Sequence, residues 1–169
     1  MIRAVLDANT LVSGFPASGG TMGELIDRWQ AGQFRLVVSQ HILSEVGRAW
    51  TKPYRQARFA QTQIDQVPAL MQQDAEVTPI TATVEGVATH PEDDIVLATA
   101  VSARVDYLAT GDKQLQALGR YQGVIIRSPR DFLTLLEQQE EEMDVETTEA
   151  DEVAGETAEN QEDDGASIS

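Results

Sequence analysis

The sequence contains no cysteine, only two histidines and no apolar run long enough to cross a membrane. The missing cysteine excludes disulfides, thiolate metal sites and cysteine nucleophiles. Any metal ion must therefore be bound by oxygen ligands or by His41 and His90. No run approaches the roughly 18 apolar residues of a membrane span, and the first residues lack the regions of a signal peptide. We expect a cytoplasmic protein that does not contact a membrane.

Basic residues are also missing from the C-terminal end of the chain. All 12 Lys and Arg precede residue 131, whereas 14 of the 28 Asp and Glu lie between Glu137 and Asp164. Residues 137–169 contain no aromatic side chain and few aliphatic ones, so they cannot bury enough surface to offset their ordering entropy. We predict a globular domain over residues 1–136 and a disordered acidic tail over 137–169. The tail is either a solubilising extension or an arm that competes with nucleic acid for a basic surface.

The first 136 residues alternate between strand-like and helix-like segments. Short aliphatic runs predict strands at 2–6, 34–38, 77–81, 107–110 and 124–126. Helical periodicity covers 21–31, 39–51, 55–73, 94–104, 112–118 and a segment from 129 into the tail. Ser39 and Ser128 are expected helix caps. This alternation predicts an α/β fold of three layers, α/β/α, with a mostly parallel sheet of about five strands.

Acidic residues lie where such a sheet binds ligands, at the carboxyl ends of its strands. Asp7 directly follows the first strand, and Asp112 follows the fourth. Asp93 and Asp94 open an apolar helix, and Glu45 lies at the edge of another helix's apolar stripe. Each has a simple structural explanation, since Asp112 can cap a helix and acids at a helix start are favoured by the helix dipole.

Together, however, these acids gather at one edge of the sheet, and the sequence near them offers few bases beyond Lys113. Their mutual repulsion calls for a cation, and hard divalent ions prefer carboxylate oxygen. Such an ion can activate water for attack on a phosphodiester, so the protein needs no nucleophile of its own.

The acids resemble those of the PIN-domain nuclease family over roughly residues 2–136. The resemblance rests on Asp7-Ala8-Asn9, on Glu45 within a helix, and on HPEDDIVLATAVSARVDYLATGDKQL, which contains Thr110-Gly111-Asp112. It is greatest for the PIN proteins described as toxins of bacterial type II toxin–antitoxin systems. Ala8 stands where the family commonly has Thr, and Thr10 where it commonly has Val. The PIN-like, Rossmann-like fold is thus expected.

The resemblance also implies roles for individual residues. It makes Mg²⁺ or Mn²⁺ the cofactor, with Asn9 and Thr110 supporting the metal ligands. We prefer Asp94 to its rival Asp93 because the family's acid is followed two and three positions later by large apolar residues. The implied catalytic and metal-binding residues are Asp7, Glu45, Asp94 and Asp112.

A cluster of bases interleaved with aromatic residues suggests an RNA-binding surface. It consists of Arg48, Lys52, Arg55 and Arg58 with Trp50, Tyr54 and Phe59. The bases could neutralise phosphates while an exposed ring stacks on a nucleobase. A cationic helix face with Trp50 in the core explains the same pattern without a ligand. Residues 13–20 are expected to form a flexible loop beside Asp7.

The sequence therefore predicts a metal-dependent endoribonuclease that hydrolyses RNA phosphodiester bonds. By resemblance, it is the toxin of a toxin–antitoxin pair, with a cognate antitoxin protein as partner and a possible homodimer. One alternative is a PIN-fold module that binds RNA or protein with little or no cleavage. A phosphoacceptor domain of the receiver type fits less well, because it would need paired acids after the first strand, where only Asp7 stands.

Overall fold

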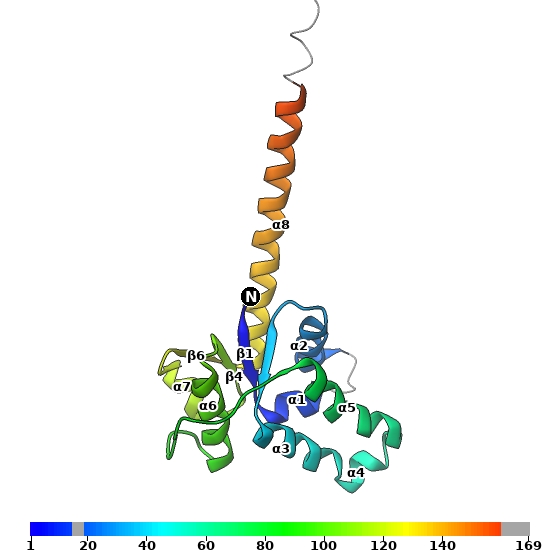
Figure 1. Cartoon of the computed structure of the whole chain (residues 1–169), viewed down its shortest axis with the longest axis vertical. Coiled ribbons are helices and arrows are strands. Elements are labelled where there is room, and N and C mark those ends of the chain that lie inside the picture. Colours follow the sequence, from blue (N-terminus) through cyan, green and yellow to red (C-terminus); the bar gives the residue numbers. More distant parts are fainter. Residues whose placement is uncertain (15–18, 160–169) are drawn as a thin grey trace, which may run out of the picture. The chain divides into compact units, whose positions relative to one another are not determined.

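A computed structural model describes residues 1–14 and 19–159 and shows an α/β fold (Figure 1). In chain order, the elements are β1 (Arg3–Leu6), α1 (Ala8–Gly14), α2 (Gly20–Gln30), β2 (Arg35–Val38), α3 (Gln40–Trp50), α4 (Pro53–Gln56), α5 (Gln61–Asp74), β3 (Glu76–Val77), α6 (Pro91–Ala103), β4 (Tyr107–Ala109), α7 (Lys113–Leu118), β5 (Arg120–Tyr121), β6 (Val124–Arg127) and α8 (Pro129–Glu159).

The strands form one six-stranded sheet in the order β3-β2-β1-β4-β6-β5. All neighbouring strands are parallel except β5 and β6, which are antiparallel. In Figure 1, α6 and α7 lie to one side of the central strands, and α2 and α5 lie to the other. The predicted three-layer arrangement with a mostly parallel sheet is confirmed. The additional strand, β5, has only two residues and is too short to give a pattern in the sequence.

Two helical segments differ from the sequence-based expectation. The single helix expected over 55–73 is instead two helices, α4 and α5, because Pro53 starts a short helix that ends before Ala60. Helix α1 was not expected; it includes Ser13 and Gly14 of the predicted loop, and the rest of that loop up to residue 18 lies outside the described residues. The expected caps are confirmed, since Ser39 accepts from the Ile42 amide and Ser128 accepts from the Asp131 amide.

Part of the acidic tail, residues 137–159, is described by the structure as helix. Helix α8 continues without interruption to Glu159 (Figure 1). Glu, Gln, Ala and Met all have high helix propensity, and they make up most of residues 137–154. These side chains are exposed, so the helix there depends on local propensity and not on burial. Residues 160–169 lie outside the described part.

The chain forms two compact units, Met1–Leu133 and Thr134–Ser169. The core of the first unit surrounds β1, β2 and β4, whose central residues are almost completely buried. The start of α8 belongs to this unit: the Phe132 ring packs edge-on against Phe34, with ring centroids 5.3 Å apart. The unit boundary falls close to the predicted domain boundary at residue 136.

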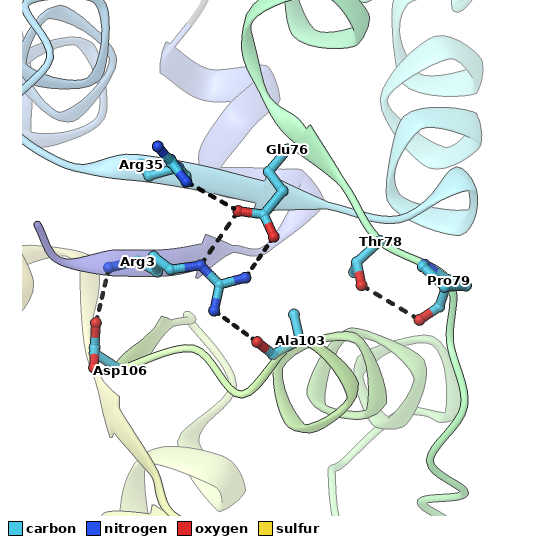
Figure 2. A network of polar contacts seen from close by, with 7 residues as sticks. All are labelled: Arg3, Arg35, Glu76, Thr78, Pro79, Ala103 and Asp106. Carbon is cyan, nitrogen blue, oxygen red and sulfur yellow. Dashed lines mark hydrogen bonds and ion pairs between the residues drawn. The ribbon is translucent and has the colours of Figure 1, made fainter.

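The amino ends of the strands are joined by a network of charged groups (Figure 2). Arg3, at the start of β1, donates two hydrogen bonds to Glu76 at the start of β3, and also donates to the Ala103 carbonyl at 2.7 Å. The Arg3 amide donates to the Asp106 carboxylate at 2.9 Å, and Arg35 lies 3.9 Å from Glu76. Acids and bases are thus paired at this edge of the sheet, which leaves the opposite edge for a different use.

Truncation after Gln138 should leave the melting temperature of the first unit unchanged. The removed side chains of residues 139–154 are exposed, so their loss creates no cavity in the core. The measurement is thermal unfolding followed by near-ultraviolet circular dichroism, with full-length protein as the control. A clear fall in melting temperature would contradict the prediction.

Candidate active site

Asp7 lies at the carboxyl end of β1, in the centre of the sheet. Its backbone amide donates to the Ala109 carbonyl of β4 at 3.1 Å, so the ends of β1 and β4 are directly joined. The side chain is only 5% exposed. A carboxylate this buried requires hydrogen-bond partners, because its desolvation is otherwise costly.

The Asp7 carboxylate has three such partners. Its Oδ1 accepts from the Thr10 amide at 2.8 Å, which caps α1. Its Oδ2 accepts from the Thr110 hydroxyl and from the Gly111 amide, both at 3.0 Å. Both oxygens are therefore held in place, one by α1 and the other by the turn that follows β4.

Asp112 is placed by the same turn. Its amide donates to the Thr110 hydroxyl oxygen at 3.1 Å, so Thr110 connects Asp112 to Asp7. Burial raises the pKa of Asp112, but the amides of Leu115 and Thr89, which donate to its carboxylate, outweigh burial and lower the pKa below its usual value. Asp112 therefore caps α7, as the sequence suggested, and remains ionised beside Asp7.

Asp93 is the third carboxylate of this group. Its pKa is raised to about 6, first by burial and then by the negative charges of Asp7 and Asp112. A hydrogen bond to the Asp112 side chain raises the pKa further, whereas His90 lowers it. Asp7, Asp93 and Asp112 are thus close enough to repel one another, and we call them the acidic centre.

Asp94, which the resemblance favoured over Asp93, lines neither cavity, whereas Asp93 lines both. The Asp94 side chain is 6% exposed and accepts hydrogen bonds from the amides of Gly86, Val87 and Ala88 at 2.9, 3.0 and 2.7 Å. It therefore anchors the loop before α6. The buried residues of α6 include five in succession, Val96 to Ala100, so the apolar spacing does not indicate which acid faces the cavities.

Glu45 lies across a cavity of about 530 Å³ from the acidic centre, which we call the first cavity. The cavity is lined by Glu45, Arg48, Ala49 and Lys52 from α3 and the turn after it, together with Asp7, Ala8, Asn9, Val12, His90, Glu92 and Asp93. Glu45 Oε1 lies 3.4 Å from His41 Nε2, within ion-pair distance but without hydrogen-bond geometry. The structure thus brings Glu45 and Asn9 to the same cavity as Asp7 and Asp93.

A second cavity of about 450 Å³ adjoins the first. Its lining residues are Asp7, Asn9, Thr10, Ser13, Met22, Thr89, His90, Asp93, Gly111, Asp112 and Lys113. His90 and Glu92, which sequence reasoning did not assign to the site, line one or both cavities. Their position at the start of α6, beside Asp93, was the signal that could have identified them.

The four predicted RNA-binding residues do not share one environment. Arg48 and Lys52 are exposed and line the first cavity. Arg55 lies over the rings of Trp50 and Tyr54, 5.1 and 5.3 Å from their centroids, and lines neither cavity. Arg58 is exposed and also lines neither. Trp50 is a core residue, whereas the Tyr54 side chain is 60% exposed.

Within residues 1–14 and 19–159, no three Asp, Glu, His or Cys side chains are arranged to hold a metal ion as they stand. The oxygens of Asp7 and Asp112 are instead engaged by amides and by the Thr110 hydroxyl. Over the same residues, no helix is both long enough and apolar enough to cross a bilayer.

The sequence profile of the PIN domain matches residues 3–114, so the chain belongs to the PIN domain family. PIN domains are generally nucleases that use divalent metal ions. Among curated proteins, none matches this chain. The chain is similar to one in the crystal structure of VapBC2 from Rickettsia felis bound to a DNA fragment from their promoter. The identity is 11%, the TM-score is 0.53, and the match covers 75% of this chain and 98% of that chain. This likeness shows the fold.

The different environments of Asp93 and Asp94 predict stability effects of opposite sign. Asp93→Asn should raise the melting temperature at pH 7 in EDTA, because it removes a charge that burial and its neighbours disfavour. The folded-state pKa of Asp93 lies above the usual value of 3.8, so stability from the protonated form is lost as the pH rises through about 6. The gain in melting temperature should therefore shrink as the pH is lowered toward 4.

Asp94→Asn is the matched comparison. Its amide would present a donor where the carboxylate now accepts from Gly86 or from Val87 and Ala88, which should cost roughly 1–3 kcal/mol. Thermal melts of both variants from pH 4 to 7 test the pair. Stabilisation by Asp94→Asn, or destabilisation by Asp93→Asn at pH 7, would show that the two acids have been placed the wrong way round.

Proposed function

We propose that this protein is a metal-dependent endoribonuclease that hydrolyses RNA phosphodiester bonds with water as the nucleophile. The observation that carries the proposal is the acidic centre itself: three carboxylates lie close together at the carboxyl edge of the sheet, with the cationic side chains of Arg48 and Lys52 along the first cavity. At the opposite edge of the sheet, by contrast, Glu76 is paired with Arg3. Unpaired like charges at a ligand-binding edge are better explained by function than by stability.

The donor chemistry of this edge fits Mg²⁺ or Mn²⁺. The side chains that could hold the ion are Asp93, Asp7, Asp112 and Glu45, all of which offer carboxylate oxygen. Mg²⁺ usually keeps several waters and takes one or two carboxylates, so it does not require three protein ligands. When bound, such an ion activates water and offsets the charge that develops on the phosphoryl oxygens.

The chain's own residues supply position and charge. Thr110 and the Thr10 amide keep the Asp7 carboxylate in a fixed orientation, and the amides of Leu115 and Thr89 do the same for Asp112. Asn9 lines both cavities, where its amide would contact the substrate. Arg48 and Lys52 would attract the RNA backbone, which the acidic centre alone would repel. Arg55 and Arg58 would extend this basic surface along α4 and the turn after it.

We further propose that the protein is a toxin that acts in the cytoplasm with a cognate antitoxin. The fold likeness to VapBC2, together with the family membership, supports this proposal. A homodimer is proposed on the family resemblance alone. Copurification of the protein with the product of an adjacent small gene, followed by loss of nuclease activity in the complex, would test the antitoxin partner.

One observation favours an alternative, a PIN-fold module that binds RNA or protein with little or no cleavage. Both oxygens of Asp7 already accept hydrogen bonds from the fold, as do both oxygens of Asp112. If these acids serve only to connect secondary structure, RNA would bind without being cut. Cleavage by the purified protein separates the two functions.

Asp93→Asn should reduce RNA cleavage by at least about a hundredfold, because it removes a carboxylate from the acidic centre while leaving the hydrogen bonds of Asp7 intact. Asp7→Asn is a poorer probe, because its side-chain NH₂ group would replace an oxygen that now accepts from Thr10 or from Thr110 and Gly111. The lost hydrogen bonds would disturb the fold as well as the site. The assay uses mixed single-stranded RNA with Mn²⁺, Mg²⁺ or EDTA. Asp65→Asn removes an exposed acid of α5 that lines neither cavity and serves as the control. Normal cleavage by Asp93→Asn would refute the site.

Divalent metal should also raise the melting temperature of the wild-type protein. An ion that binds only the folded state at a hundredfold excess over its Kd stabilises it by about 2.7 kcal/mol, or roughly 5–10 °C for a domain of this size. Scanning calorimetry with MgCl₂ or MnCl₂ measures the shift, with EDTA as baseline. The shift should be lost in Asp93→Asn and kept in Asp65→Asn; an equal shift in all three proteins would place the ion elsewhere.

A further inference from the structure

Two carboxylates of the acidic centre lie on the boundary between the two cavities. Asp7, Asn9, His90 and Asp93 line both cavities, whereas Asp112 lines only the second. Helix α1 separates the two spaces, since Ala8 and Val12 line only the first cavity, whereas Thr10 and Ser13 line only the second. A ligand that reaches the acidic centre can therefore extend from it in two directions.

Each cavity also has a cation among the residues that it does not share with the other. Arg48 and Lys52 line only the first cavity, and Lys113 lines only the second. Lys113 is exposed, and its Nζ has one weak contact, 3.4 Å from the Gln116 side-chain oxygen. Carboxylates accompany these cations, since Glu45 and Glu92 line only the first cavity and Asp112 lines only the second. A single phosphate would need only one of the cations, whereas a strand could use one in each cavity.

From this arrangement, we propose that one RNA strand crosses both cavities, with Lys113 binding a backbone phosphate on the opposite side of the scissile bond from Lys52. The proposal rests on the proposed ribonuclease function and adds a substrate-binding residue, Lys113, to it. Flexible single strands suit the site, because the two cavities share four lining residues and offer separate spaces for the nucleotides on each side. The scissile phosphate then lies beside the acidic centre, between two lysines that each bind a neighbouring phosphate.

Binding of single-stranded RNA tests the proposal without requiring cleavage. The binding measurement uses fluorescence anisotropy with a labelled twelve-nucleotide oligouridylate, the Asp93→Asn protein as background, and a series of salt concentrations. Each phosphate contact on a single strand contributes about 0.7 to the slope of log K against log salt. Lys113→Ala and Lys52→Ala should each lower the slope by about 0.7, and the double variant by about 1.4. Arg120→Ala removes an exposed base that lines neither cavity and should leave the slope unchanged.

Cleavage then tests whether the two lysines act on opposite sides. Once a cut site is mapped, the next phosphate on either its 5′ or its 3′ side is replaced by a neutral methylphosphonate. Lys113→Ala should lower kcat/KM about fivefold on unmodified RNA, as expected for one exposed charge pair. This effect should vanish with one of the two neutral substrates, and the effect of Lys52→Ala should vanish with the other. A merely structural role for Lys113 would lower kcat/KM equally on all substrates.

The outcomes separate this proposal from the function on which it rests. An unchanged salt slope in Lys113→Ala, or loss of both lysine effects with the same neutral substrate, would overturn the two-sided strand path even if the protein is a ribonuclease. Absence of RNA binding would overturn it as well. Binding with the expected slopes but no cleavage by the wild-type protein would support the strand path and refute the nuclease.

Discussion

The desolvation of one carboxylate, Asp7, is the constraint on which the site depends. A buried carboxylate at the end of β1 must be given hydrogen-bond donors, and the fold supplies them from α1 and from the turn after β4. The same contacts join the ends of β1 and β4. They also place the Thr110 hydroxyl oxygen where it accepts a hydrogen bond from the Asp112 amide. The hydrogen bonds that satisfy Asp7 therefore also cap α1, hold the turn after β4 and position Asp112.

The two edges of the sheet use charge in opposite ways. At the amino ends of the strands, Arg3 and Arg35 are paired with Glu76, so the charges there connect β1, β2 and β3. At the carboxyl ends, Asp7 and Asp112 lie near Asp93, whose pKa is raised first by burial and then by their negative charges. The three carboxylates and the ion pairs of Glu76 lie at opposite edges of the sheet. A substitution in one group therefore does not directly disturb the other.

The strand-end acids and one helix cap could be predicted from the sequence, because an acid directly after a buried strand has few structural explanations. The positions of Asp7 and Asp112 followed from their place after aliphatic runs, and Ser39 from its place before a helical one. Asp93 could not be separated from Asp94, since α6 is buried nearly all round and its sequence has no polar face to indicate direction. Helix α1 is too short to show a period. The composition of residues 137–159 shows that they cannot bury much apolar surface, but their high helix propensity still allows α8 to continue to Glu159.

The hydrogen bonds of Asp94 have a consequence for how the site is built. Neighbouring residues on a helix point about 100° apart, so fixing Asp94 against Gly86, Val87 and Ala88 also fixes the angle at which Asp93 projects. The loop therefore restricts rotation of α6 about its axis, although Gly86, Val87 and Ala88 line neither cavity. An insertion or a proline there would disrupt the hydrogen bonds to Asp94 and so remove one constraint on the direction in which Asp93 projects.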